Sequence, residues 1–355
     1  MARTTRTGVR ARTRTKTTAA TIATSGAPSS HALSRTAVSP RPDPEREIAD
    51  RLIAAIEAGT PPWRQPWTGG AGCPFPMRAT GEAYRGVNVL MLWLTASENG
   101  YASPFWMTYR QAIELGGQVR GGERATLVVK YGVVEREAGT EGGGSGGGKA
   151  GGAREGSGQQ DAGEATRRPY LKAYHVFNAA QVDGLPERFL READPVRDVG
   201  TAGDRELDAY FGRLGATVET TPEPRAYYHP ARDVIHMPPV ATFHTTKGYY
   251  ATLGHEAVHW TGHGSRLDRL ARCRDREAYA FEELVAEVGQ CLLLARLGVE
   301  PAVDQSAAYI EGWLKAMRDD KRAIFRAAAE AQRAVDLIRE RCGATLQGDP
   351  AAGGR

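Results

Sequence analysis

The run His255-Glu256-Ala257-Val258-His259 constrains this chain more than any other part of its sequence. It lies in a stretch whose apolar residues recur with helical spacing, so residues four apart share one face of a helix. Both imidazoles can therefore point at one metal ion, with Glu256 within reach of a water molecule on that ion. The pattern predicts a helix that carries a catalytic metal centre. The alternative is a pair of surface histidines on an amphipathic helix.

The residue types in this run favour Zn²⁺ as the cofactor. A catalytic zinc ion takes three protein ligands and leaves a fourth position for water, which then loses a proton near neutral pH. Glu256 is the catalytic residue in this interpretation, because its carboxylate would accept that proton and pass it to a leaving amine. The run therefore indicates a zinc-metallopeptidase-type site, with His255 and His259 as the first two ligands.

The third ligand has to come from elsewhere in the chain. His263 follows His259 by four residues and, on a continuing helix, lies too far along to share the ion. We interpret it as a helix-end residue or as a partner behind the ligands. Glu283 and Glu287 lie one turn apart on a later apolar-periodic segment. We expect Glu283 to bind the metal and Glu287 to accept the N–H of a ligand histidine, although the spacing also allows the two roles to be exchanged.

Composition narrows the class of protein. The chain has 355 residues, of which 41% are hydrophobic and 25% charged, values typical of a globular protein with room for two domains. No apolar run approaches the ~20 residues of a membrane helix, and no apolar signal segment is evident. The four cysteines form no CxxC pair, which argues against a disulfide framework and a cysteine zinc site. We expect a cytoplasmic protein with no membrane partner.

Charge is distributed unevenly along the chain. Residues 1–42 contain eight Lys or Arg and no acidic residue, so the net charge of +4 leaves about −4 for the remainder. A basic arm on a near-neutral body suggests contact with nucleic acid. The alternative is a solubilising extension, and either way the composition predicts disorder.

Periodicity predicts an α+β fold with two domains. Helices are expected from Asp43, around Val89 to Leu94, from Thr108 with a capping box, and at 246–263, 277–297 and 305–341. Strands are expected near 125–134, 170–177, 216–220, 226–229 and 234–237. The predicted organisation is a disordered basic arm (1–43), a first domain (44–188), a linker (189–203), a metallopeptidase domain (204–341) and a disordered tail (342–355).

The segment Ala138 to Ala165 is nearly half glycine and cannot bury a core. It separates two predicted strands within the first domain. We therefore interpret it as an insert in a hairpin and not as the boundary between domains.

Longer segments of the sequence extend the interpretation. The first domain contains PPWRQPW, YRGVNVLMLW, GYASPFWMTYRQAIELGGQVRGGE and YHVFNAAQVDGLP. The second domain contains GHEAVHWTGHGSRLDR, FEELVAE and AAYIEGWLKAMRDDKRAIF. In this order, from about Glu45 to Leu337, they closely resemble the ArdC antirestriction family. The resemblance implies an N-terminal α+β domain that binds single-stranded DNA, shared with TraC-type plasmid primases, and a C-terminal zincin-like metallopeptidase domain. It also implies a mobile element, such as a conjugative plasmid, and protection of incoming DNA from host restriction.

Candidate DNA-binding residues come from the first domain, where aromatic and basic side chains mix. Single-stranded DNA is bound by stacking bases on aromatic rings and by contacting phosphates with Lys or Arg. The residues selected on this mixture and on the resemblance are Tyr84, Arg85, Asn88, Trp106, Arg120 and Lys130.

Three functions fit these features. The first is a single-stranded DNA-binding antirestriction protein with a zinc peptidase domain, for which a host protein substrate is a candidate partner. The second is a binding protein whose zincin domain is a metal-bound scaffold without required proteolysis. The third, an accessory to DNA processing, is disfavoured because no polymerase-type carboxylate cluster accompanies the aromatic and basic residues. The sequence does not separate the first two.

Overall fold

A computed structural model describes residues 43–61, 75–136, 166–190, 199–200, 203–301 and 307–343. Several sequence-based predictions fall outside these residues. They are the basic arm, the aromatic pair Trp63 and Trp67, the glycine-rich insert, most of the 189–203 linker and most of the C-terminal tail.

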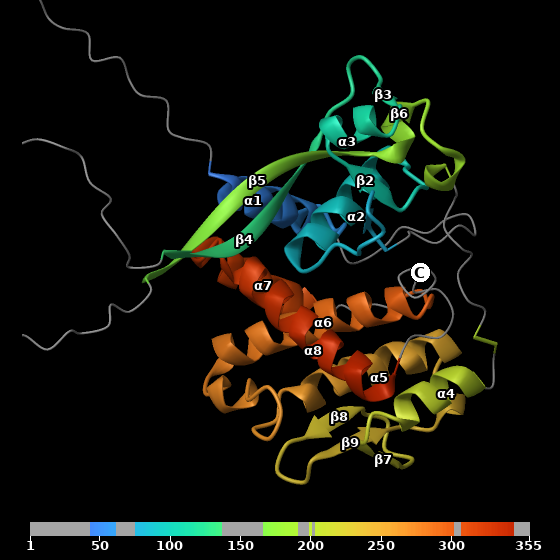
Figure 1. The fold of residues 1–355 in the computed structure, drawn as a ribbon. Coiled ribbons are helices and arrows are strands. Elements are labelled where there is room, and N and C mark those ends of the chain that lie inside the picture. The colour runs from blue at the N-terminus through green and yellow to red at the C-terminus, as the bar shows by residue number, and fades with distance from the viewer. Residues whose placement is uncertain are drawn as a thin grey trace, which may run out of the picture. The chain divides into compact units, whose positions relative to one another are not determined.

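The N-terminal part contains a four-stranded sheet in the order β1-β2-β5-β4 (Figure 1). Its strands are β1 (Met77–Arg78), β2 (Phe105–Met107), β4 (Thr126–Arg136) and β5 (Thr166–Asn178). β1 and β2 are parallel, and the other pairings are antiparallel. β4 and β5 pair along the whole length of β4, so the strands on either side of residues 137–165 pair with each other. A second, two-stranded sheet joins β3 (Gln118–Val119) to β6 (Val182–Asp183).

Three helices accompany this sheet: α1 (Pro44–Glu57), α2 (Val87–Asn99) and α3 (Tyr109–Glu114). Asp43 caps α1 by accepting hydrogen bonds from two amides of its first turn. α2 is buried along most of its length, which fits its nearly continuous apolar sequence. The capping box predicted at the start of α3 is confirmed, since Thr108 and Gln111 each accept a backbone N–H of the other.

The C-terminal part begins with α4 (Arg205–Gly212) and a three-stranded sheet in the order β7-β9-β8. The strands are β7 (Thr217–Thr220), β8 (Tyr227–His229) and β9 (Val234–Met237). Four helices follow: α5 (Thr246–Thr261), α6 (Arg276–Arg296), α7 (Ala307–Asp319) and α8 (Ala323–Cys342).

The prediction of one helix over 305–341 is wrong, because the chain turns between α7 and α8. At this turn the Asp320 side chain accepts the amide N–H of Arg322, and the Asp320 carbonyl accepts that of Ala323. A short acidic side chain that bonds the backbone two residues on favours a turn over a continuing helix.

Residues 42–355 form one compact unit with a large continuous core. That core includes side chains of α1 and α2 as well as of α5, α6 and α8. Around it, three acidic residues of α1 pair with basic residues at the α7–α8 turn: Glu45 with Arg322, Asp50 with Lys321, and Glu57 with Arg318. Among the described helices none is long and apolar enough to cross a membrane.

Because β4 pairs with β5, we expect the glycine-rich segment between them to be dispensable for folding. Replacing residues 138–165 by a four-residue turn should change the free energy of unfolding by only about 1–2 kcal/mol, because loop-closure entropy varies slowly with loop length. Thermal unfolding of the shortened and full-length chains measures this difference. As a control, a proteolytic cut within the segment should leave two fragments that elute together from a native column. Fragments that separate would contradict the pairing.

Candidate metal centre

The candidate centre forms where α5 packs on α6. Gly289 of α6 faces Val258 of α5 so closely that a Cβ on Gly289 would lie 2.8 Å from Val258 Cγ2. Contacts of that length do not occur between real side chains, so any larger residue at position 289 would push the helices apart. The close approach brings the histidine face of α5 against the acidic face of α6.

Three side chains converge at this contact. The Nε2 atoms of His255 and His259 are 3.1 Å apart, and Glu283 places its two carboxylate oxygens 3.4 and 3.5 Å from them. One ligand atom from each residue lies within 4.8 Å of the other two. Tetrahedral zinc with ligands at ~2.0–2.1 Å separates its ligand atoms by ~3.3 Å. The distance between the two nitrogens and the distance from each nitrogen to its nearer Glu283 oxygen are close to this value, and the three donors are of the kind that a catalytic zinc ion takes.

Each histidine presents its other ring nitrogen to a second carboxylate. His255 Nδ1 lies 3.6 Å from Glu287 Oε2, and His259 Nδ1 lies 3.3 Å from Glu282 Oε1. A carboxylate at Nδ1 favours the proton on that nitrogen and leaves the lone pair of Nε2 free for a metal. Glu287 therefore lies at Nδ1 of His255, and Glu282 occupies the equivalent position at Nδ1 of His259.

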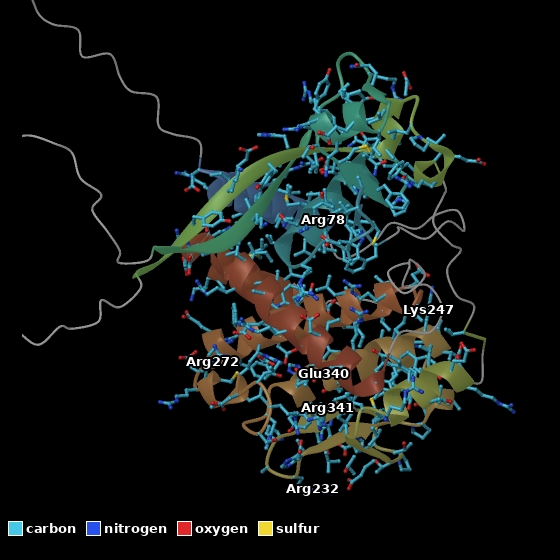
Figure 2. All side chains as sticks on the ribbon, in the orientation of Figure 1. Arg78, Arg232, Lys247, Arg272, Glu340 and Arg341 are labelled. Atoms are coloured by element: carbon cyan, nitrogen blue, oxygen red, sulfur yellow. The ribbon has the colours of Figure 1, made fainter. Side chains whose placement is uncertain are left out.

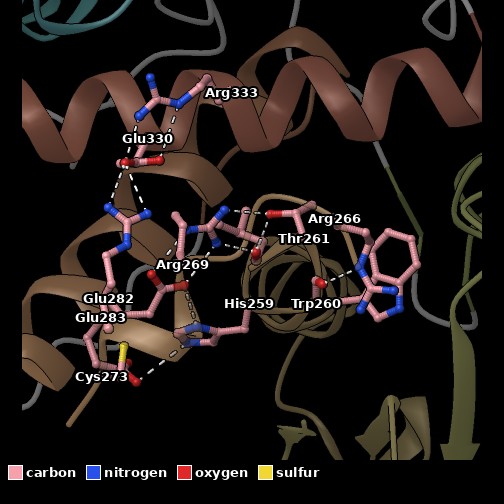
Figure 3. Close-up of polar contacts among 12 residues, drawn as sticks. His259, Trp260, Thr261, Arg266, Arg269, Cys273, Glu282, Glu283, Glu330 and Arg333 are labelled. Carbon is pink, nitrogen blue, oxygen red and sulfur yellow. Dashed lines mark hydrogen bonds and ion pairs between the residues drawn. The ribbon is translucent and has the colours of Figure 1, made fainter. Parts of the chain in front are cut away.

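Glu282 is held in turn by Arg269, and both side chains are almost completely buried. The Arg269 guanidinium donates to both carboxylate oxygens of Glu282, at 2.9 and 3.1 Å. It also donates to Thr261 Oγ1 and to the carbonyl of Val258, at 2.9 and 2.7 Å (Figure 3). Arg269 thus joins the end of α5 to the start of α6 and fixes the carboxylate that faces His259.

The buried carboxylates determine the charge of the histidines. Burial alone would lower the pKa of His255, but Glu283 and Glu287 outweigh it and raise the pKa to about 10. Burial is likewise outweighed at His259, where Glu282 and Glu283 raise the pKa to about 9. For Glu283, burial would raise the pKa, and the two histidines hold it well below its usual range. An imidazole must be neutral to bind a metal, so a bound cation takes the place of these protons.

Glu256 lies beside the cluster, and its charge contributes to the raised pKa of both histidines. Its side chain is buried, whereas the His255 side chain keeps 22% of its exposure, which gives the centre an open side. His263 lies beyond the end of α5, where its ring contacts Ser265. It is therefore a helix-end residue, outside the metal-type cluster.

Sequence reasoning missed Glu282 and Arg269. Glu282 precedes Glu283 directly, and neighbours on a helix point in different directions, so spacing gave it no place at the same ion. The available signal was the acidic residue itself, which lies in an apolar segment that is expected to be buried. A buried carboxylate requires a cation beside it, and Arg269 supplies that charge.

The six candidate DNA-binding residues lie in different environments. Trp106 is 2% exposed and Tyr84 6% exposed, so both rings are part of the core. Asn88 donates its amide to the carbonyl of Val129 and accepts the N–H of the same residue, which satisfies the backbone of Val129 at the edge of β4. These three side chains have structural roles, and the two buried rings present no open surface to a base.

The three basic candidates are exposed. Arg85 pairs with Asp336 of α8, and Arg120 pairs with Glu123 and Asp183. Lys130 is exposed on β4, and no carboxylate of the described residues lies within ion-pair distance of it. The structure therefore distributes the six residues among core, strand edge and surface and does not bring them together.

Two protein families match successive parts of this chain. Residues 42–177 match the N-terminal domain of the anti-restriction factor ArdC, and residues 205–330 match a zincin-like metallopeptidase domain. Among solved structures, the antirestriction protein ArdC of plasmid R388 is 54% identical. Its metal-free form covers 85% of this chain and 99% of its own length, with a TM-score of 0.71. Its Mn(II)-bound form covers 85% and 98%, with a TM-score of 0.69.

Similar curated sequences include protein y4eC of Sinorhizobium fredii. It is 39% identical over 82% of this chain and 90% of its own length. A DNA primase TraC of Escherichia coli is 38% identical over 82% of this chain, which spans only 26% of the primase. The similarity to TraC therefore concerns a minor part of that protein.

The cluster predicts which substitutions abolish metal binding. His259→Ala or Glu283→Gln should reduce the zinc content of purified protein from about one equivalent to near zero, because each removes one of three ligands. Elemental analysis after dialysis measures the content. His263→Ala is the matched control and should keep its zinc, since this residue lies outside the cluster. Full zinc in Glu283→Gln would remove Glu283 from the ligand set.

The Arg269–Glu282 pair should act on both stability and metal affinity. Glu282→Gln leaves the buried Arg269 without its charge partner and should destabilise the fold by about 3–5 kcal/mol. The double variant Arg269→Met with Glu282→Met removes both charges and should recover most of that loss. Its zinc affinity should nevertheless stay ~10–100-fold below wild type, because His259 Nδ1 lacks its carboxylate. Wild-type affinity in the double variant, measured by competition with a chelator, would show that Glu282 does not orient His259.

Proposed function

This chain belongs to the ArdC family of antirestriction proteins, and from that premise we propose that it binds single-stranded DNA and carries a zinc-dependent peptidase-type centre. In this proposal it acts in the cytoplasm of a cell that receives a mobile element and protects the incoming DNA from restriction. The observation that carries the enzymatic part is the convergence of His255, His259 and Glu283 beside Glu256.

The donor set favours zinc within the divalent metals. Two imidazoles and one carboxylate form a common ligand set of catalytic zinc, whereas Mn²⁺ prefers sites richer in oxygen. The R388 protein was solved with Mn(II), which supports a divalent cation in this family. Zinc remains our proposal for this chain, because Nε2 of both histidines faces the shared position.

The roles of the chain's own residues follow from their positions. A zinc ion, when bound, supplies Lewis-acid chemistry that polarises a carbonyl and eases the deprotonation of water. Glu256 is proposed as the general base that takes the proton of the attacking water and delivers it to the leaving amine. Glu282 and Glu287 keep the two imidazoles oriented during this proton transfer. The partly exposed side of His255 is where a peptide would approach.

The DNA-binding part of the proposal rests on the N-terminal match and on exposed basic residues of that region. The related primase TraC acts on DNA as its name states, but this chain spans about a quarter of it. Primase activity is therefore not part of the proposal. A host protein is the proposed substrate class of the peptidase centre.

A second candidate function uses the same residues without proteolysis. In that case the metal holds α5 and α6 together as a scaffold, and protection arises from DNA binding alone. The origin of the ligands favours this possibility, because His255 and His259 lie on α5 and Glu283 on α6, so a bound metal would bridge the two helices.

Glu256→Gln separates the two functions. The amide keeps the shape of the side chain but cannot accept a proton, so peptidase activity should fall by ~10²-fold or more. The measurement is survival of single-stranded plasmid DNA entering a restricting host, with zinc content as the control for folding. If proteolysis is required, protection should be lost. Unchanged protection with full zinc occupancy would contradict the peptidase proposal and favour the scaffold.

A further inference from the structure

The register of the β4–β5 hairpin places four particular side chains on one face. Lys130 of β4 pairs directly with Lys172 of β5. The neighbouring pairs on the same face are Gly132 with Tyr170 and Val128 with Tyr174, because directly opposite residues point to the same side and the period along a strand is two. We call Lys130, Tyr170, Lys172 and Tyr174 the hairpin face.

The aromatic rings of this face are supported from below. A Cβ on Gly132 would lie 2.4 Å from Tyr170 Cζ, so the tyrosine ring lies across the backbone of β4 in the space that a side chain would fill. Tyr170 nevertheless keeps 39% of its exposure. Tyr174 is partly buried, and Lys172 Nζ lies 5.1 Å from the centre of its ring. The result is an exposed aromatic surface at one end of the face and a cation beside a second ring.

The charges of the face are unusual for a hairpin. Like charges directly opposite each other across two strands are destabilising. Lys130 and Lys172 nevertheless lie opposite each other, and both side chains are exposed. Among the residues that the structure describes, neither lysine lies within ion-pair distance of a carboxylate. Several arginines elsewhere in the N-terminal part do have such partners: Arg78 pairs with Glu82, Arg110 with Glu114, and Arg120 with Glu123. Two uncompensated positive charges in register suit an anionic ligand.

The combination identifies the class of anion. The exposed ring of Tyr170 can accept a base by stacking, which requires an unpaired base, and lysines contact phosphates as point charges. Tyr170 and Tyr174 are four residues apart on β5, about 13 Å along the strand, with the lysine pair between them. A single strand lying along this face can place a base at Tyr170 and its backbone at the ammonium groups.

We propose that the hairpin face is the surface on which this protein holds single-stranded DNA. The proposal rests on the proposed DNA-binding function and assigns it to particular residues. It keeps Lys130 from the sequence-based set and replaces the buried rings of Tyr84 and Trp106 with the exposed ring of Tyr170. Tyr170 stacks a base, and Lys130 and Lys172 contact phosphates.

The test uses the full chain and a fluorescent oligo(dT) of about 16 nucleotides, within the range that one binding module covers. Anisotropy titrations at several salt concentrations give the affinity and its salt dependence. Lys130→Gln with Lys172→Gln should weaken binding by ~10-fold or more and reduce the salt slope by about 1.4, because each contact to single-stranded phosphate contributes ~0.7. Tyr170→Leu should weaken binding ~5–100-fold without changing the slope, whereas Tyr170→Phe should bind like wild type.

A matched control removes two positive charges elsewhere. Arg232 and Lys247, both labelled in Figure 2, pair with Glu219 and Glu300 in the C-terminal part. Arg232→Gln with Lys247→Gln changes the net charge equally and should leave affinity and slope within about twofold of wild type. Thermal unfolding and zinc content of all variants check that the fold is kept.

Three outcomes would overturn the proposal in distinguishable ways. Wild-type protein that does not bind oligo(dT) at low salt would remove the DNA-binding function itself. Binding by wild type that the lysine and tyrosine variants leave unchanged would remove the hairpin face alone. Double-stranded DNA that competes as well as the single strand would exclude stacking on Tyr170.

Discussion

The contact between α5 and α6 is the constraint on which the candidate centre depends. Two histidines on one helical face can reach a common ion only if a third donor approaches at the same level, and Glu283 does so because Gly289 lets the helices come close. Such proximity would bury several carboxylates without compensation. Arg269 and the two imidazoles supply opposite charge, and a bound cation would supply it in place of the imidazole protons.

The same helices connect the centre to the rest of the chain. α6 packs on α8 as well as on α5, and α8 reaches the N-terminal part through Arg85 with Asp336 and through Gln332 with the amide of Gly86. Side chains of both parts share one core. The regions that match the two families therefore belong to one folded unit. A ligand of the N-terminal part would bind the same unit that holds the metal-type cluster.

Much of this arrangement could be predicted from single residues. The run from His255 to His259 determined the helix and two of the converging side chains, because a spacing of four allows few alternatives. The capping box at Thr108 and the apolar face of α1 were equally local. The sequence could not reveal the break at Asp320 or the placement of Glu282, since both depend on neighbours distant in the chain. The sequence could not reveal the burial of Trp106 and Tyr84 for the same reason. An aromatic residue near arginines has the same local sequence whether its ring stacks on a base or fills a core.

X-ray absorption at the zinc edge of the zinc-loaded protein tests the central claim most directly, because it reports the atoms that bind the metal without requiring activity. The account predicts a four-coordinate ion at ~2.0–2.1 Å from nitrogen and oxygen, with the outer-shell scattering of two imidazoles. The imidazole scattering should weaken by about half in His259→Ala. Sulfur in the first shell, or a six-coordinate shell of oxygen without imidazole, would contradict the assignment of His255, His259 and Glu283 to one metal.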